Sequence, residues 1–155
     1  MDNKEFITKN AQETEKLGGT LARKVTPIQG STLDERKKAL VVGLEGELGS
    51  GKTTFIKGFA KALGIKEKIS SPTFVLIKSY KIGKHKFLIH IDAYRLKDHQ
   101  DLISLGIKDI LNDADNIVLI EWSDRVKKIL PKEYLKIHID HIEKNERKIT
   151  FQLSL

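Results

Sequence analysis

The segment GLEGELGSGKTTF, residues 43–55, constrains the fold of this chain more than any other stretch of its sequence. Residues 46–53 match the pattern G-x-x-x-x-G-K-[ST], a loop whose backbone N–H groups surround phosphate oxygens. The pattern belongs between a strand and a helix, because the N-terminus of the helix also favours the anion. The sequence therefore predicts an α/β fold built around a nucleoside triphosphate site.

The residues on either side of the pattern supply both of these elements. Residues 39–44 form a short apolar run of the buried-strand type, and this run leads directly into the loop. Apolar residues then recur at helical spacing from Phe55 to Leu63, and Gly64 is suited to end the helix. Strand, glycine-rich loop and helix thus follow one another in the required order.

The side chains of the loop have distinct expected roles. We expect Lys52 to contact the β- and γ-phosphates and to act in catalysis, and Thr53 to be a ligand of Mg²⁺. Thr54 either offers a second hydroxyl towards the α-phosphate or is an ordinary residue of a helix N-terminus. The loop residues expected to bind the nucleotide are Leu48, Gly49, Ser50, Gly51, Lys52, Thr53 and Thr54.

Two acidic residues stand at the ends of apolar strand-like runs. The run FLIHID ends in Asp92, and the run NIVLIE ends in Glu121. In sheets of this kind the site lies beyond the carboxyl ends of the strands, where Mg²⁺ and the attacking nucleophile both need a carboxylate. We therefore expect both acids to be catalytic. Which of them orients the attacking water stays open, and the alternative for either is a capping charge.

Further candidate residues each carry an alternative interpretation. The hydroxyl of Thr73 could sense the γ-phosphate, as switch loops do, or it belongs to a turn before a strand. Trp122, next to the second acid, either walls the site or belongs to the core. We interpret His90, His138 and His141 as ordinary strand histidines, since the spacing of the last two places their rings on opposite faces.

The rest of the chain completes a predicted single domain, residues 1–155. Its remaining predicted elements are a helix at 10–24, an antiparallel hairpin of strands 73–80 and 87–92, helical turns at 97–111, a strand at 116–122, a short helix at 124–130 and a terminal hairpin. The predicted fold class is α/β of the P-loop NTPase type. Its central sheet is mixed and mostly parallel, with flanking helices and antiparallel hairpin additions.

The amino-acid composition limits which cellular compartment and which kinds of partner are expected for this chain. The chain has no Cys, which excludes disulfides and thiolate chemistry and fits a cytoplasmic protein. We expect neither a membrane span, which needs about 18 apolar residues, nor a secretory signal at the N-terminus. Residues 66–97 hold eight positive and two negative residues, and so +6 of the net charge of +7. This excess suits a phosphate-rich partner such as nucleic acid, or is a solvated lysine-rich surface.

An ordered series of motifs extends over most of the chain. The motifs are ETEKLGGTLA (13–22), GELGSGKTTF (46–55), SPTFVL (71–76), HIDAYRL (90–96), LGI (105–107), IEW (120–122) and LP (130–131). In this order they resemble the TsaE (YjeE) family of small bacterial P-loop ATPases, which are required for threonylcarbamoyladenosine modification of tRNA. The succession of S-P-T-F, H-x-D-x-Y-R and E-W is specific, and small kinases do not carry it.

The resemblance implies a protein that hydrolyses ATP slowly alone and acts with TsaB-like and TsaD-like partners on adenosine 37 of tRNA. It implies ATP and Mg²⁺ as cofactors, with Thr53 and Glu121 at the Mg²⁺ site and Asp92 as the acid that serves hydrolysis. The segment around Thr14 matches a stretch that lies near the nucleotide. The positions matching residues that line the site or the partner surface are Thr73, Tyr94, Arg95 and Trp122.

Departures from the family pattern leave the partner surface open. Ser123 stands where the family usually has Pro, residues 26–38 are longer than the usual short turn, and the positive charge is untypical. Two other functions also stay open. A small P-loop kinase would need an Arg-rich lid, whereas the chain has five Arg in all, and a nucleotide-dependent scaffold would need the same phosphate-sensing groups. The absence of an N-K-x-D motif favours ATP over GTP.

Overall fold

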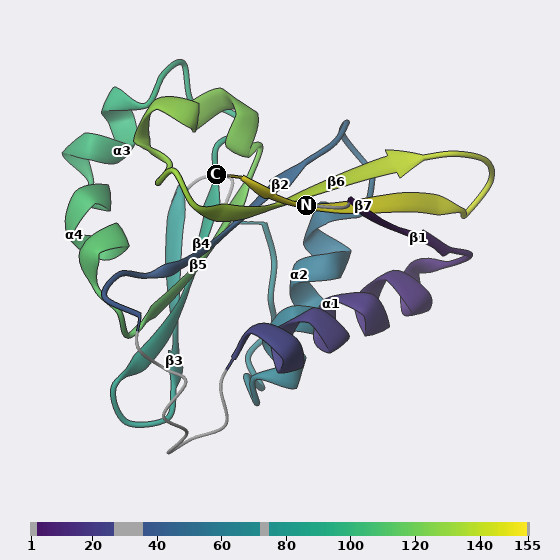
Figure 1. Cartoon of the computed structure of the whole chain (residues 1–155), viewed down its shortest axis with the longest axis horizontal. Helices are drawn as coiled ribbons and strands as arrows, with labels where there is room; N and C mark the ends of the chain where they lie inside the picture. Colours follow the sequence, from purple (N-terminus) through teal and green to yellow (C-terminus); the bar gives the residue numbers. More distant parts are fainter. Residues whose placement is uncertain (1–2, 27–35, 72–74, 155) are drawn as a thin grey trace.

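The computed structural model describes residues 3–26, 36–71 and 75–154, and a seven-stranded sheet forms its centre (Figure 1). The strand order is β1-β7-β6-β2-β5-β4-β3. The strands are β1 (Lys4–Thr8), β2 (Leu40–Glu45), β3 (Ile77–Ile82), β4 (Lys86–Asp92), β5 (Asn116–Glu121), β6 (Tyr134–His141) and β7 (Arg147–Ser154). The helices are α1 (Ala11–Val25), α2 (Lys52–Ala62), α3 (Gln100–Ser104), α4 (Ile107–Asn112) and the 3₁₀ helix η1 (Ser123–Ile129).

The middle of the sheet is parallel and its two sides are antiparallel. β2 pairs in parallel with both β5 and β6, and β4 pairs in parallel with β5. β3 pairs antiparallel with β4, and β7 pairs antiparallel with β6 and β1. The predicted α/β fold with a mixed sheet and antiparallel hairpins is therefore confirmed. None of the helices in the described ranges is long and apolar enough to cross a membrane.

Two cores cover the two faces of the sheet, and Figure 1 shows the helices divided between them. On one face α1 and α2 pack Leu21, Phe55 and Phe59 against the strands. On the other face α3 and α4 contribute Leu102 and Ile107. All six residues of β5 are buried, because a central parallel strand is covered on both faces. This burial explains the continuous apolar runs that mark the inner strands in the sequence.

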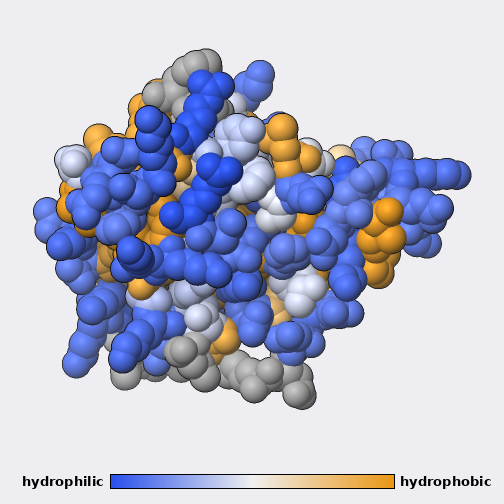
Figure 2. Space-filling view, turned by 90° about the horizontal axis from the view of Figure 1, so that it is seen from above, coloured by the Kyte–Doolittle hydropathy of each residue, from blue (hydrophilic) through white to orange (hydrophobic). Residues whose placement is uncertain are grey.

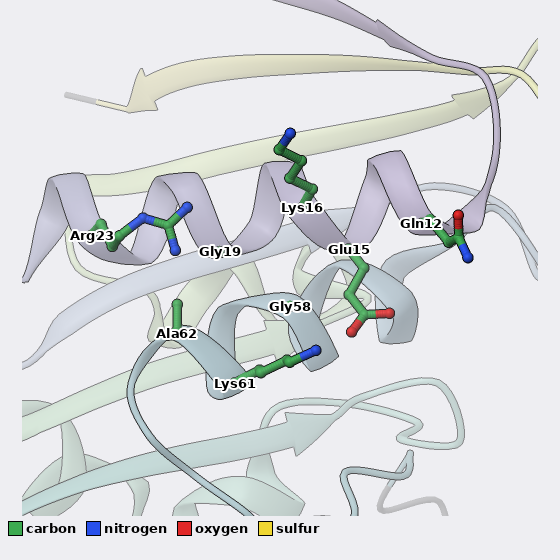
Figure 3. Close-up of a pocket in the computed structure, with 8 residues that line it drawn as sticks. All are labelled: Gln12, Glu15, Lys16, Gly19, Arg23, Gly58, Lys61 and Ala62. Carbon is green, nitrogen blue, oxygen red and sulfur yellow. The ribbon is translucent and has the colours of Figure 1, made fainter.

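Glycines allow α1 and α2 to pack backbone against backbone. A Cβ placed on Gly58 would collide with the backbone of Glu15, and one placed on Gly18 would collide with the carbonyl of Phe55. Figure 3 shows Gly19 of α1 and Gly58 of α2 where the two helices face each other, with charged side chains on both helices. These residues line a groove of about 530 Å³. Gly18 and Gly19, the glycine pair of the ETEKLGG motif, thus allow α1 to pack closely against α2.

Some elements differ from those predicted. Residues 4–8 form β1, which the sequence pattern did not predict, and η1 is a 3₁₀ helix. β3 begins at Ile77, later than the predicted strand, after Leu76 with a φ of 65°. The start of the predicted strand 73–80 lies outside the described residues.

Candidate functional site

The loop between β2 and α2 depends on glycine conformations. Gly46, Gly49 and Gly51 have φ values of 141°, 77° and 110°, which side chains with a Cβ rarely adopt. The N–H of Ser50 donates to the carbonyl of Glu47 at 3.1 Å, which closes the loop. Since Gly51 directly precedes α2, the loop ends at the N-terminus of an eleven-residue helix, where anions are favoured.

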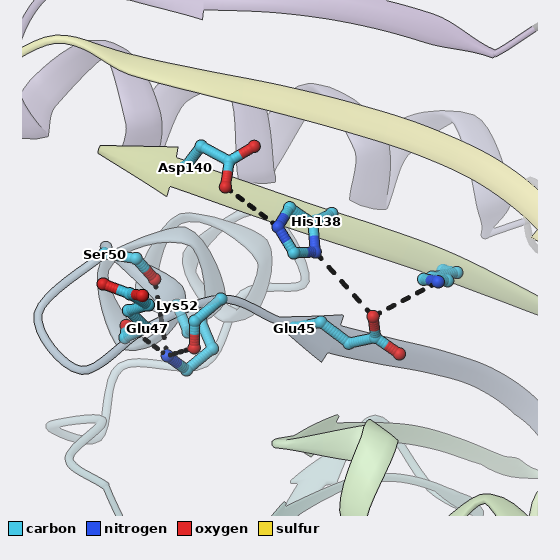
Figure 4. Close-up of polar contacts among 8 residues, drawn as sticks. Glu45, Glu47, Ser50, Lys52, His138 and Asp140 are labelled. Carbon is cyan, nitrogen blue, oxygen red and sulfur yellow. Dashed lines mark hydrogen bonds and ion pairs between the residues drawn. The ribbon is translucent and has the colours of Figure 1, made fainter. Parts of the chain in front are cut away.

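Lys52 is buried inside this loop (Figure 4). Its Nζ donates to the carbonyl oxygens of Gly46 at 2.6 Å and Glu47 at 2.8 Å. The same ammonium lies 4.2 Å from the centroid of the Trp122 ring. Burial lowers the pKa of Lys52, whereas nearby carboxylates, with Glu121 first among them, act in the opposite direction. The side chain of Lys52 therefore lies against the carbonyl oxygens of its own loop, where it also faces a cavity beside the loop.

Asp92 and Glu121 lie side by side at the carboxyl ends of β4 and β5. The two residues are paired in register, and their exposed fractions are 5% and 3%. Thr53 Oγ1 donates to Glu121 Oε1 at 2.7 Å. The N–H of Tyr94 donates to Asp92 Oδ1 at 3.0 Å, and Ser71 Oγ donates to Oδ2 of the same carboxylate. The structure thus brings both sequence-predicted acids together with the predicted metal-ligating hydroxyl.

A cavity of about 390 Å³ lies between the loop and these acids. It is lined by all seven loop residues expected from the sequence, by both acids and by Trp122, with Ser71 and Tyr94 in addition. Trp122 has a φ of 60°, and its ring centroid lies 5.0 Å from that of Tyr94. Trp122 therefore walls the cavity while it also packs against one of the cores.

Of the predicted residues that the structure describes, Thr14 and Arg95 do not line this cavity. Thr14 is buried between α1 and β1, where its Oγ1 lies 2.7 Å from Thr8 Oγ1. A Cβ on Gly51 would lie 3.8 Å from the methyl group of Thr14, so α1 begins close to the loop. Thr73 falls outside the described residues, and its expected role stays a prediction.

His90 lies in a strand as expected, and the structure adds a contact that its interpretation as an ordinary strand histidine did not include. Its Nε2 lies 2.9 Å from Glu121 Oε2, and the ring is fully buried. The signal was present, because alternate residues of a strand share a face and His90 precedes Asp92 by two positions. Ser71 was also missed. Arg147, whose Nε donates to the carbonyl of Ser50 at 2.8 Å, is 97 residues away in the chain and gives no local signal.

A second polar cluster lies beside the loop on the β6 side (Figure 4). Glu45 Oε2 lies 3.2 Å from Lys136 Nζ and 3.7 Å from His138 Nδ1, and His138 Nε2 lies 2.9 Å from Asp140 Oδ1. His141 Nε2 contacts the backbone oxygen of Lys144. Among the residues described here, no group of three or more His, Asp or Glu could hold a metal ion by itself.

The residues of the cavity nevertheless suit Mg²⁺ bound together with phosphates. Thr53 and Glu121 present adjacent oxygen atoms, and Asp92 adds a second carboxylate. Magnesium in nucleotide sites is held by one or two carboxylates, water and substrate phosphates, so a complete protein cage is not required. Lys52 and the N-terminus of α2 could hold the phosphates on the other side.

The parallel core, the glycine-rich loop and the two strand-end acids define a domain of the P-loop NTPase type. Residues 8–149 match the family described as threonylcarbamoyl adenosine biosynthesis protein TsaE. The chain therefore belongs to the TsaE family, and the resemblance found in the sequence is confirmed. The family acts in the biosynthesis of threonylcarbamoyladenosine in tRNA.

Individual relatives agree with this assignment. The chain is 43% identical over 111 residues to the tRNA threonylcarbamoyladenosine biosynthesis protein TsaE of Bacillus subtilis, covering 72% of this chain and 68% of the relative. It is 35% identical over 144 residues to TsaE of Treponema pallidum, covering 93% and 96%. The crystal structure of Bacillus subtilis YdiB superposes with a TM-score of 0.76 at 32% identity, covering 99% of this chain and 87% of that one.

Proposed function

We propose that this protein binds ATP with Mg²⁺ in the cavity beside the loop and hydrolyses it during threonylcarbamoyladenosine biosynthesis. The observation that carries the proposal is the 2.7 Å contact between Thr53 Oγ1 and Glu121 Oε1. It joins the hydroxyl of the phosphate-loop pattern to a carboxylate from a different strand. Two adjacent oxygen ligands beside a helix N-terminus are the arrangement that a magnesium–nucleotide complex needs.

The side chains divide the work between binding and hydrolysis. Lys52 and the backbone N–H groups of the loop bind the phosphates, and Lys52 balances charge that develops on the γ-phosphate. Thr53 and Glu121 hold the cation, which, when bound, neutralises phosphate charge and orients the γ-phosphate. Because Glu121 is the acid bonded to Thr53, Asp92 is left as the acid that orients the attacking water.

The family's place in threonylcarbamoyladenosine biosynthesis implies that the protein acts with other proteins of that pathway. We propose that the protein acts with TsaB-like and TsaD-like proteins and meets tRNA through their complex. Leu48 lines the cavity and is 73% exposed, so the mouth of the cavity is open to solvent and accessible to another protein. Figure 2 shows a face that is mostly hydrophilic, with separate small hydrophobic areas, so a partner surface would combine apolar and polar contacts.

The test compares Lys52→Ala with Lys57→Ala, an exposed position on the same helix. Binding of a fluorescent ATP analogue is measured with and without Mg²⁺, and ATP turnover is measured alone and with both partners and tRNA. Lys52→Ala should lose binding or turnover sharply, because it removes the charge that faces the β- and γ-phosphates, and Lys57→Ala should retain both.

The same assays separate the competing functions. Wild-type turnover in a folded Lys52→Ala variant would contradict the phosphate-loop assignment. Nucleotide binding without turnover, even in the complete complex, would favour the scaffold. Transfer of the γ-phosphate to a small acceptor in place of water would favour a kinase.

A further inference from the structure

His90 contacts Glu121 from behind the cavity. The ring is 0% exposed, and its Nε2 lies 2.9 Å from Glu121 Oε2. The other oxygen of the same carboxylate, Oε1, accepts the hydrogen bond from Thr53 at 2.7 Å. Glu121 is therefore held at both oxygens, by β4 on one side and by α2 on the other.

The surroundings of the ring indicate which nitrogen carries the proton. Nδ1 of His90 is buried and has no hydrogen-bond partner within the described part of the chain. A proton on Nδ1 alone would bury an unpaired N–H and would turn the lone pair of Nε2 towards a carboxylate oxygen. A proton on Nε2 instead makes a hydrogen bond to Glu121, so His90 acts as a donor to this carboxylate.

The strand register gives this donor a fixed place. His90 and Asp92 share one face of β4, since they are two residues apart. Asp92 is paired with Glu121 on β5, so His90 lies one row behind the two acids, on the side of the sheet interior. In this position the ring reaches Glu121 but does not line the cavity.

We propose that His90 is a positioning residue for Glu121. Its hydrogen bond to Oε2 fixes the plane of the carboxylate, and Oε1 is thereby directed at Thr53 and at the cation beside it. Without the donor, one buried oxygen of Glu121 would lack a partner, and the carboxylate could turn away from the cation. Hydrogen bonds to ligating carboxylates typically change metal affinity or activity by about 10- to 100-fold. The inference rests on the proposed function, because it assumes that Mg²⁺ and a nucleotide bind in the cavity.

The experiment compares two substitutions at His90 with a matched control. His90→Leu removes the donor and keeps an apolar side chain in the site, whereas His90→Gln offers an amide N–H near the position of Nε2. Leu88→Val is the control, because Leu88 is also 0% exposed and lies two residues earlier on the same face. Affinity for a fluorescent ATP analogue is measured over a series of Mg²⁺ concentrations and in EDTA, together with thermal unfolding.

We expect His90→Leu to raise the Mg²⁺ concentration for half-maximal nucleotide binding by about tenfold or more, with little change in EDTA. His90→Gln should recover most of this loss, and Leu88→Val should lower the Tm without changing the Mg²⁺ requirement. If His90→Leu does not fold, His90→Asn replaces it. Its shorter amide does not reach Glu121, and it should therefore behave as His90→Leu.

Two results would contradict the inference, and they are distinguishable from failure of the proposed function. An Mg²⁺ requirement in His90→Leu or His90→Asn equal to that of the wild type would leave His90 with a purely structural role. A Gln variant as impaired as the Leu variant would show that the donor is not the cause. Absence of Mg²⁺-dependent nucleotide binding in the wild type would instead overturn the proposed function, and this inference with it.

Discussion

Gly58→Ala should destabilise the protein, although Gly→Ala inside a helix usually does the opposite. Gly58 lies within α2, where Ala is normally favoured over Gly by about 1 kcal/mol. Here the added Cβ would lie 2.9 Å from Glu15 Cα, with the carbonyl carbon and oxygen of Glu15 closer still. These atoms belong to the backbone of α1, so no side-chain rotation relieves the collision and the two helices must separate.

The size of the effect follows from two opposing contributions. Overpacking typically costs about 1–3 kcal/mol, and we take about 3 kcal/mol because the obstacle is backbone. Subtracting about 1 kcal/mol of helix propensity leaves a loss of about 2 kcal/mol in the free energy of unfolding. For a chain of this length that corresponds to a decrease in Tm of about 4–8 °C.

Thermal unfolding monitored by circular dichroism measures the change, with Lys57→Ala as the neighbouring control. Lys57 is exposed on the same helix, so its replacement should alter stability by at most about 0.5 kcal/mol. A Tm for Gly58→Ala equal to or above that of the wild type would refute the reasoning. It would mean that α1 and α2 can move apart at little cost in free energy.

Two further predictions concern the two acids and the lysine-rich hairpin that β3 and β4 form. Glu121→Gln should weaken Mg²⁺-dependent nucleotide binding, whereas Asp92→Asn should mainly slow ATP turnover. The division of roles would be contradicted if both variants lost turnover equally and the Mg²⁺ dependence of nucleotide binding stayed unchanged in both. Exchanging the exposed Lys81 and Lys84 for Gln should lower the affinity of the complete complex for tRNA. The slope of log affinity against log salt concentration should also flatten, by about one unit for each phosphate that is no longer neutralised. Polarisation titrations at several salt concentrations measure both effects. An unchanged slope would mean that these charges only solvate the hairpin.

The elements that could be predicted are those whose signals are local. The loop pattern, the apolar run of β2 and the helical spacing of α2 are contiguous, so the pattern of residues 39–63 was sufficient to assign all three correctly. The two hairpins were predicted for the same reason, since strand alternation and a turn lie within about 20 residues of sequence. β1 was missed because the segment KEFIT is short and half polar, and its partner β7 lies at the other end of the chain.

The supports of the two acids were harder to predict than the acids themselves. Asp92 and Glu121 are buried next to each other, and like charges at this spacing repel each other, so each acid needs donors of its own. Asp92 accepts from Ser71 and from the N–H of Tyr94, while Glu121 accepts from Thr53 and is paired with His90. These donors come from a loop, from β4 and the turn that follows it, and from α2. Thr53, Ser71 and His90 lie 68, 21 and 31 residues away in the chain from the acids that they contact, whereas each acid ends an apolar run that is visible in the sequence. Contacts of this kind exist only once the sheet has set its register, and the sequence alone does not specify that register.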